Sequence, residues 1–286
     1  MSPMDRPQDD LLVGTDWLGA NLDADDLAIV DASWHMPASG RSGRREYEAA
    51  HIPGAVHFDI DEIADRTRGL AHTIPVAAEF ARAAGALGIS EDMRIVVYET
   101  EFPFSAPRVW LMFSAMGARK VSVLDGGLAR WRAEGRPLET GAAVRPPARF
   151  AADFDAARII GLEAMRGIVA GATAQVIDAR SPARFTGAEA DPRPGVRPGH
   201  MPGAVNMHYQ TFRGPRGGFR STDELAALFA AAGIDIDGPV AATCGSGVTA
   251  AVPLLALALL GRTGALYDGS WSEWGARDDT PAETGP

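Results

Sequence analysis

The stretch His51-Ile-Pro-Gly-Ala-Val56 returns later in the chain as His200-Met-Pro-Gly-Ala-Val205. Two further segments recur in the same order around it: Ile29-Val-Asp-Ala32 as Val176-Ile-Asp-Ala179, and Asp125-Gly-Gly-Leu-Ala-Arg-Trp131 as Asp268-Gly-Ser-Trp-Ser-Glu-Trp274. Self-similarity in a fixed order indicates one structural unit written twice. We therefore expect a first domain over residues 1–140, a linker rich in proline, alanine and glycine over 141–157, and a second domain over 158–286.

Within each half, short apolar runs alternate with alanine-rich segments of helical character. The runs are at 95–98, 121–124, 176–177 and 239–242, and the helical segments at 76–87 and 223–232. This alternation is typical of a parallel sheet with crossover helices. The runs are continuously apolar, as in strands covered on both faces. The fold class we predict is α/β, with two tandem domains, each a mainly parallel sheet flanked by helices on both faces.

Composition limits the function classes. The net charge of −10 and the lack of a dense basic run argue against a nucleic-acid partner. The longest apolar run, residues 248–260, is too short to span a bilayer and contains Pro253, and residues 1–10 lack the apolar core of a signal peptide. With a single cysteine no internal disulfide is possible. We expect a cytoplasmic protein with no membrane segment.

That single cysteine, Cys244, follows an apolar run and precedes Gly245-Ser-Gly247 and a helical segment expected to begin near Val248. Both glycines can adopt backbone angles closed to other residues, so the loop can direct N–H groups at the sulfur. The helix N-terminus stabilises a thiolate in the same way. A lone cysteine is more often buried and inert, but this loop favours a nucleophile.

The duplication provides an internal control, since features of both halves serve the fold and features of one half are candidates for function. Counting back from Ser105, the residue equivalent to Cys244 is Thr100, and Pro103 replaces the second loop glycine. We therefore expect no nucleophile and no backbone cradle in the first half. His51 and His200 are shared, which indicates packing roles, and the histidines show no metal-site spacing.

Three chemistries fit a loop of this kind. A phosphatase loop would need an arginine to clamp phosphate where Ala250 stands. Gly245-Ser-Gly-Val-Thr-Ala250, with Asp268 further on, also satisfies a dinucleotide-binding pattern, but too little chain follows to complete such a domain. The third chemistry is sulfur transfer, in which the loop holds a thiolate and then a persulfide.

The chain resembles the two-domain sulfurtransferases of the rhodanese family, most of all their mercaptopyruvate branch. The resemblance covers nearly the whole chain. It is carried by Cys244-Gly-Ser-Gly-Val-Thr-Ala250, by Asp268-Gly-Ser-Trp-Ser-Glu-Trp-Gly275, by the two His-x-Pro-Gly-Ala turns and by Ser105-Ala-Pro-Arg-Val-Trp110. In that family the first domain is catalytically silent and the second carries the cysteine.

The resemblance also implies a donor. Thiosulfate-using relatives place basic residues directly after the cysteine, where this chain has Gly245 and Ser246. A doubly charged donor thus lacks its counter-charge, and we expect 3-mercaptopyruvate as donor, a Cys244 persulfide and release of pyruvate. The alternatives that stay open are a thiosulfate sulfurtransferase and a non-catalytic persulfide carrier or binding module.

Further site residues follow from the same resemblance. Arg184 and Arg193 stand where the branch grips the donor's carboxylate and keto oxygen, with Arg197 a weaker candidate. The loop residues expected to contact substrate are Gly245, Gly247, Val248 and Thr249. Asp61, His72 and Ser246 match a family proton relay, and the residues around His72 depart from the commoner wording of that motif. No cofactor or metal is implied, and the acceptor is a thiol such as reduced thioredoxin, or cyanide.

Overall fold

The computed structural model describes residues 11–286, so residues 1–10, where we expect no signal peptide, lie outside the described part. Contacts divide the chain into two units. Unit 1 comprises residues up to Ala64, Ile74–Asp155 and Arg213–Phe219, and unit 2 comprises Asp65–Thr73, Ala156–Phe212 and Arg220–Pro286. The domain boundaries predicted from the sequence stay a prediction.

Much of the predicted linker has regular partners within unit 1. The backbone N–H of Ala148 donates to Gly85 O at 2.9 Å, and that of Asp153 donates to Met116 O at 3.0 Å. Phe150 is buried and contacts the ring of Phe80 edge-on. These residues were expected to form a linker because they lack apolar periodicity, but single side chains and main-chain bonds suffice to attach an irregular segment to a core.

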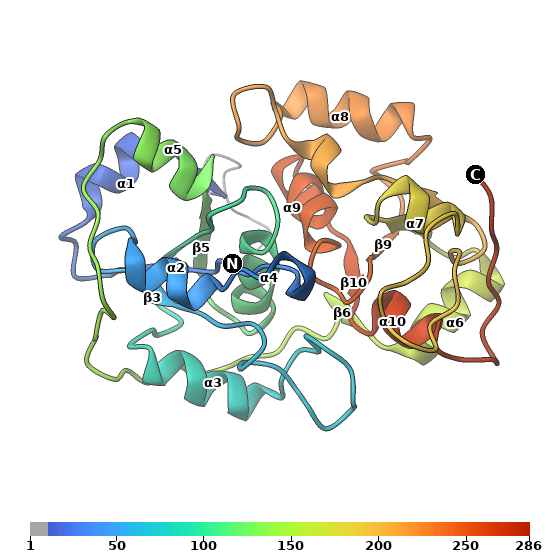
Figure 1. The fold of residues 1–286 in the computed structure, drawn as a ribbon, viewed down its shortest axis with the longest axis horizontal. Helices are drawn as coiled ribbons and strands as arrows, with labels where there is room; N and C mark the ends of the chain where they lie inside the picture. The colour runs from blue at the N-terminus through green and yellow to red at the C-terminus, as the bar shows by residue number, and fades with distance from the viewer. Residues whose placement is uncertain (1–10) are drawn as a thin grey trace. The chain divides into compact units, whose positions relative to one another are not determined.

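Unit 1 contains a parallel sheet of five strands in the order β1-β5-β4-β2-β3 (Figure 1). Its strands are β1 (Leu12–Val13), β2 (Leu27–Asp31), β3 (Val56–His57), β4 (Arg94–Tyr98) and β5 (Lys120–Leu124). Its helices are α1 (Thr15–Asn21), the 3-10 helix η2 (Pro37–Ser39), α2 (Gly43–Ala49), α3 (Ala77–Ala86), α4 (Ala106–Ala115) and α5 (Gly127–Ala133).

Unit 2 repeats this topology with the order β6-β10-β9-β7-β8, again with parallel pairing. Its strands are β6 (Ile159–Ile160), β7 (Gln175–Asp178), β8 (Ala204–Asn206), β9 (Val240–Thr243) and β10 (Ala265–Tyr267). Its helices are α6 (Leu162–Gly171), α7 (Pro182–Thr186), the 3-10 helix η3 (Tyr209–Phe212), α8 (Thr222–Ala231), α9 (Ala251–Leu259) and α10 (Ser270–Trp274). The predicted fold class and duplication are confirmed.

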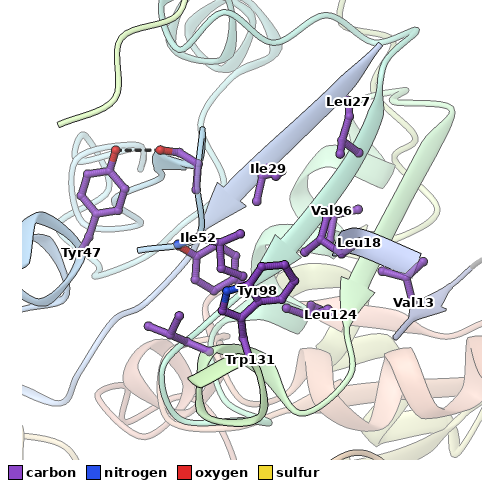
Figure 2. Packing of buried hydrophobic residues seen from close by; sticks show 12 residues of the cluster. Val13, Leu18, Leu27, Ile29, Tyr47, Ile52, Val96, Tyr98, Leu124 and Trp131 are labelled. Carbon is purple, nitrogen blue, oxygen red and sulfur yellow. Dashed lines mark hydrogen bonds between the residues drawn. The ribbon is translucent and has the colours of Figure 1, made fainter. Parts of the chain in front are cut away.

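Both faces of the unit 1 sheet are covered, as the apolar runs predicted. On one face, the side chains of Val96 and Tyr98 pack with Leu18 of α1 and Trp131 of α5 (Figure 2). Because side chains alternate along a strand, Ile95 and Val97 face the other side, and both are fully buried. Helix α4 contacts β4 and β5, and all of its residues are buried. The sheet is therefore an interior layer.

Unit 2 is built on the same plan. Met165 of α6 and Trp271 of α10 pack against Val176 and Ala241 of the sheet. Helix α9 is almost wholly buried, and its Pro253 lies in the first turn, where the missing N–H has no helical partner to lose. Helix α8 begins with a capping box in which Ser221 and Glu224 bond each other's backbone N–H. Local signals and burial agree at each of these helices.

The repeated histidines have packing roles in both units. His51 Nδ1 lies 2.8 Å from Tyr47 O and its ring stacks on Tyr47. His200 Nδ1 lies 2.9 Å from Phe185 O and its ring stacks on Phe185. Both imidazoles are buried. Their shared position in the two halves is explained by this packing.

Strand register corrects the equivalence that we drew between the halves. Asp31 lies opposite Tyr98 in unit 1, and Asp178 lies opposite Thr243 in unit 2. The residue after each strand is therefore Glu99 in unit 1 and Cys244 in unit 2, so Thr100 is not the counterpart of the cysteine. Counting back from Ser105 failed because it pairs Ser105 with Thr249, whereas the loops 99–105 and 244–250 have equal length and Ser105 corresponds to Ala250.

Glu99 also shows that the first half does have a backbone cradle. Its Oε1 accepts a hydrogen bond from Phe104 N at 2.7 Å and its Oε2 accepts one from Ser105 N at 2.5 Å. The expectation that Pro103 abolishes the cradle is wrong, because the amides beyond this proline still point at the carboxyl group. The loop that follows this strand is shaped to receive an acceptor or an anion, even where no cysteine is present.

No helix among residues 11–286 combines the length and the apolar character that crossing a membrane requires.

Glu99 makes stability depend on pH. Burial raises the pKa of Glu99 to about 7, although the N–H groups of Phe104 and Ser105 oppose the rise. Ser105 Oγ is 2.6 Å from Ala32 O and 2.9 Å from Glu99 Oε2. One hydroxyl proton cannot serve both acceptors, and a protonated Glu99 removes the conflict.

Since the folded pKa is raised, this group stabilises the fold fully below its unfolded pKa of about 4.5, and that contribution is lost as the pH rises through about 7. Urea unfolding should show a fall of up to ~3 kcal/mol from this group across that window. Glu99→Gln should flatten the slope, while the exposed Glu79→Gln should retain it. A Glu99→Gln curve parallel to that of the native protein would refute the prediction.

Candidate functional site

Cys244 stands directly after β9, at the carboxyl end of the strand, and is 2% exposed. Gly247 adopts the left-handed conformation with φ of 81°. Helix α9 begins at Ala251, later than the start expected near Val248. A left-handed residue cannot belong to a right-handed helical turn, so the chain completes its turn around the loop before the helix starts.

Gly245 leaves space beside the loop backbone, which differs from the reason that the sequence suggested for a glycine here. Its φ is outside the left-handed region, but a Cβ at this position would lie 3.2 Å from Arg184 Nη2 and 3.4 Å from Arg193 Nη1. Both distances are tighter than ordinary contact. The glycine thus lets two guanidinium groups approach the backbone beside Cys244.

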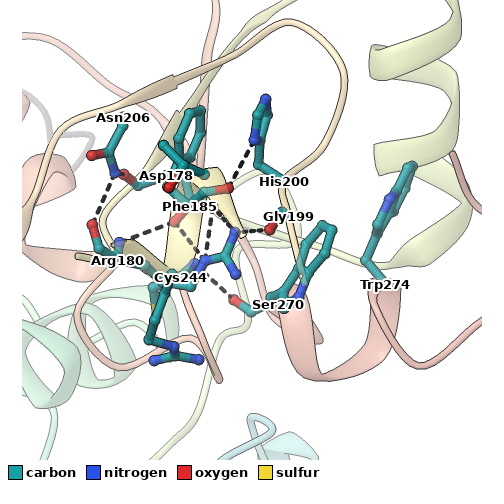
Figure 3. A network of polar contacts seen from close by, with 12 residues as sticks. Asp178, Arg180, Phe185, Gly199, His200, Asn206, Cys244, Ser270 and Trp274 are labelled. Carbon is teal, nitrogen blue, oxygen red and sulfur yellow. Dashed lines mark hydrogen bonds and ion pairs between the residues drawn. The ribbon is translucent and has the colours of Figure 1, made fainter. Parts of the chain in front are cut away.

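The loop backbone is held by the start of α10. Cys244 N donates to Ser270 Oγ at 3.3 Å, and Trp271 N donates to Cys244 O at 3.0 Å (Figure 3). Ser272 N donates to Gly245 O at 2.9 Å. These bonds fix the peptide unit that carries the sulfur, so the position of the thiol is set by the main chain and not by a flexible loop.

A buried ion pair lies beneath this arrangement. Arg180 donates to both carboxylate oxygens of Asp178, with Nη2 to Oδ2 at 2.5 Å, and also donates to Gly199 O at 2.8 Å (Figure 3). Its guanidinium lies 4.5 Å from the ring centroid of Trp271. Both side chains of the pair are almost inaccessible. The pair connects the end of β7 to the helix that holds the cysteine loop.

Arg184 and Arg193, predicted from the sequence, lie close together on one carboxylate. Ser181 caps α7 by accepting from Arg184 N, and Arg184 Nη2 donates to Asp191 Oδ2 at 2.5 Å. Arg193 Nη1 donates to Asp191 Oδ1 at 3.2 Å. Asp191 was missed by sequence reasoning. An acidic residue between two candidate arginines, in a segment with no counterpart in the first half, was the signal available.

His72 lies beside the cysteine loop. Its Nδ1 is 2.9 Å from Ser246 Oγ, and both residues are buried. The segment 65–73 that carries His72 belongs to unit 2, although its neighbours in sequence belong to unit 1. Arg68 attaches this segment by donating to Glu273 Oε1 of α10 at 2.9 Å. The structure thus brings together two of the three predicted relay residues.

Glu273 links this attachment to the sheet. Tyr267, the last residue of β10, donates to Glu273 Oε2 at 2.8 Å. Burial raises the pKa of Tyr267 far above its usual range, and the neighbouring carboxylate raises it further. The phenol therefore remains a neutral donor, and Glu273 accepts hydrogen bonds from both Tyr267 and Arg68.

Asp61, the third predicted relay residue, belongs to unit 1, where its Oδ2 accepts from Trp34 Nε1 at 2.8 Å. Its role stays a prediction. Arg197, the weaker candidate for donor binding, has its guanidinium directed at main-chain oxygens: Nη2 donates to Thr280 O at 2.9 Å and Nε to Gly275 O at 3.2 Å. These bonds indicate a structural role for Arg197.

Val248 and Thr249 provide the carbonyl groups that start α9, at 3.3 Å from Ala251 N and 3.1 Å from Val252 N. Their predicted contacts with substrate stay a prediction. Within the described residues, 11–286, no group of three or more His, Cys, Asp or Glu side chains is placed to hold a metal ion.

Known proteins resemble this chain along almost its whole length. The family model described as Rhodanese-like domain matches residues 14–134 and 162–277. The 3-mercaptopyruvate sulfurtransferase of Escherichia coli K12 is 44% identical over 273 residues, 95% of this chain and 97% of that protein. The human 3-mercaptopyruvate sulfurtransferase is 42% identical over 270 residues, 92% of this chain and 91% of that one.

A solved structure is similar as well. The crystal structure of SseA from Escherichia coli, described as a 3-mercaptopyruvate sulfotransferase, aligns with a TM-score of 0.84 and 43% identity. The alignment covers 92% of this chain and 99% of that one.

Removing one partner of the buried pair should destabilise the site. Arg180→Met leaves Asp178 charged and buried, and we expect a loss of about 3–5 kcal/mol in unfolding free energy. Arg262→Met, at the exposed pair with Asp237, should cost under about 1 kcal/mol. Urea denaturation of both variants measures the loss of unfolding free energy. Equal losses would show that burial of the Asp178–Arg180 pair does not raise the cost of removing one partner.

Proposed function

The chain belongs to the rhodanese family, and on that premise we propose that it is a sulfurtransferase that takes sulfur from 3-mercaptopyruvate, carries it as a Cys244 persulfide and releases pyruvate. The observation that carries the proposal is the position of the only cysteine: Cys244 follows a central strand, on a fixed backbone, next to Arg184 and Arg193. The names of the relatives at 42–44% identity support the choice of donor.

In the first half-reaction the Cys244 thiolate attacks the sulfur of the donor's thiol group. A bond forms between the two sulfurs, the bond from sulfur to C3 of the donor breaks, and its electron pair leaves on pyruvate enolate. The enolate takes up one proton to become pyruvate, and the cysteine retains the outer sulfur as a persulfide. No external oxidant is consumed, because C3 of the donor takes the electron pair of the broken bond and is reduced as the two sulfurs are joined.

The two arginines orient the donor. Guanidinium forks match a carboxylate and an adjacent keto oxygen through paired N–H donors. Arg184 Nε is buried and has no hydrogen-bond partner among the described residues, 11–286, so a donor remains for a ligand. An unpaired buried donor is costly in the absence of a ligand and favours one that supplies an acceptor.

The loop amides stabilise the sulfur anion. Glu99 of unit 1 stands at the position of Cys244 and accepts the N–H groups of Phe104 and Ser105. The corresponding amides of unit 2, counted back from the start of each following helix, are those of Thr249 and Ala250. The carboxylate of the silent half thus supports a persulfide-binding role for the equivalent loop.

Protons move through Ser246 and His72, whose contact at 2.9 Å can pass a proton in either direction. Asp61 is the third residue of the proposed relay. Val248, Thr249, Gly245 and Gly247 contact the reacting sulfur only through their backbone.

In the second half-reaction an acceptor thiolate attacks the outer sulfur of the persulfide and restores the Cys244 thiolate. A small thiol or reduced thioredoxin fits this step, and cyanide serves in the test tube. The proposal places the enzyme in the cytoplasm, since a lone free cysteine suits a reducing compartment.

The first test compares pyruvate release from 3-mercaptopyruvate with sulfur transfer from thiosulfate, using one shared acceptor. The native protein should favour 3-mercaptopyruvate by about a hundredfold or more, since the loop lacks charges for a dianion. Cys244→Ser should be silent with both donors, and folding is checked by its urea midpoint. Preference for thiosulfate would replace the donor but keep the reaction class, and no turnover with either donor would favour a persulfide carrier.

A second test concerns the attachment of the His72 segment. Arg68→Ala removes the ion pair with Glu273 and frees the segment, so kcat should fall by about tenfold while KM for the donor changes little. Arg262→Ala, at the exposed pair with Asp237, is the matched control. A rise in KM without a fall in kcat would show that Arg68 serves donor binding instead.

A further inference from the structure

Asp191 is the one carboxylate that both donor-binding arginines contact among the described residues, 11–286. Its side chain is 1% exposed, whereas those of Arg184 and Arg193 are 15% and 29% exposed. Oδ2 accepts from Arg184 Nη2 at 2.5 Å, and Oδ1 accepts both from Arg193 Nη1 at 3.2 Å and from Arg193 N at 3.0 Å. The carboxylate is therefore fixed from both sides.

The nitrogens that bind Asp191 are also those nearest the cysteine loop. Arg184 Nη2 and Arg193 Nη1 lie 3.2 and 3.4 Å from where a Cβ of residue 245 would stand. Asp191 thus determines where both forks stand relative to Gly245. It also neutralises one of their two positive charges at the place where the donor binds.

The two guanidinium groups and the one carboxylate together have a charge of +1; the Cys244 thiolate adds a negative charge that either donor meets. The other buried cation described next to the loop backbone, Arg180, is balanced by Asp178 and leaves this balance unchanged. A site with one net positive charge matches a monoanion. A dianion would bring one uncompensated negative charge to a site that already contains the Asp191 carboxylate, and like charges repel.

We propose that Asp191 is a specificity-determining positioning residue, which sets the charge of the donor site so that it accepts monoanionic 3-mercaptopyruvate and discriminates against dianionic thiosulfate. This inference rests on the proposed function, because it assigns the donor to the arginines beside Cys244. It places donor selection in the segment between α7 and β8, in addition to the absence of basic residues after the cysteine.

The test is a charge series read as the ratio of kcat/KM for thiosulfate to kcat/KM for 3-mercaptopyruvate, with one acceptor. Asp191→Asn raises the local charge to +2, and the ratio should rise by about tenfold or more. Asp191→Glu retains the charge but moves the forks, so absolute rates fall while the ratio stays within about threefold of native. If Asp191 had a purely structural role, its substitution would lower kcat/KM equally for both donors and leave the ratio unchanged.

Arg193→Gln supplies the opposite change and is available even where Asp191→Asn does not fold, because Arg193 is partly exposed. It lowers the local charge to zero, and the ratio should fall by about tenfold. An unchanged ratio in Arg193→Gln and in every folded Asp191→Asn preparation would overturn the inference. A shift in the ratio of Asp191→Glu as large as that of Asp191→Asn would also overturn it. A native protein that turns over neither donor would instead overturn the proposed function, so the two failures are distinct.

Discussion

The parallel pairing of β7, β9 and β10 is the constraint on which the site depends. Asp178 lies opposite Thr243, and Leu266 lies opposite Ala242, so all three strands end at the same edge of the sheet. The segments that follow supply the arginines, the cysteine loop and the hydroxyl and amides that hold it. Since ligands bind at the carboxyl edge of parallel sheets, residues distant in sequence meet there without a dedicated scaffold.

The two halves show how one loop was adapted to two purposes. In unit 1 the residue after the central strand is Glu99, whose carboxyl is buried and bound by the amides of its own loop. In unit 2 the same position is Cys244, and in the proposed reaction the corresponding backbone would hold its sulfur anion. An internal carboxyl fills the cradle of the silent half, which explains why that half retains the loop shape without the chemistry.

Charge at the site is governed by pairing rather than by the number of arginines. Arg180 is balanced by Asp178 and serves packing, and Arg197 is directed at main-chain oxygens. Arg184 and Arg193 share one buried carboxylate. A reaction whose donor is a small anion and whose intermediate is a sulfur anion needs a limited positive charge, and this arrangement supplies it without leaving the guanidinium groups mobile.

The sequence alone determined the duplication and the α/β class, because repeated segments and continuous apolar runs are local patterns. It also predicted Cys244 as the nucleophile, from a glycine loop after a strand. It also picked out Arg184, Arg193 and the pair His72 and Ser246, through resemblance. It misjudged Thr100, since counting from Ser105 pairs that residue with Thr249, and only strand register shows that its counterpart is Ala250. Only the tertiary structure revealed that Asp191 binds both arginines and that Arg68 binds Glu273 of α10. These contacts join segments whose spacing in sequence follows no period or motif. The reason for Gly245 likewise appears only once the guanidinium groups are in place beside it.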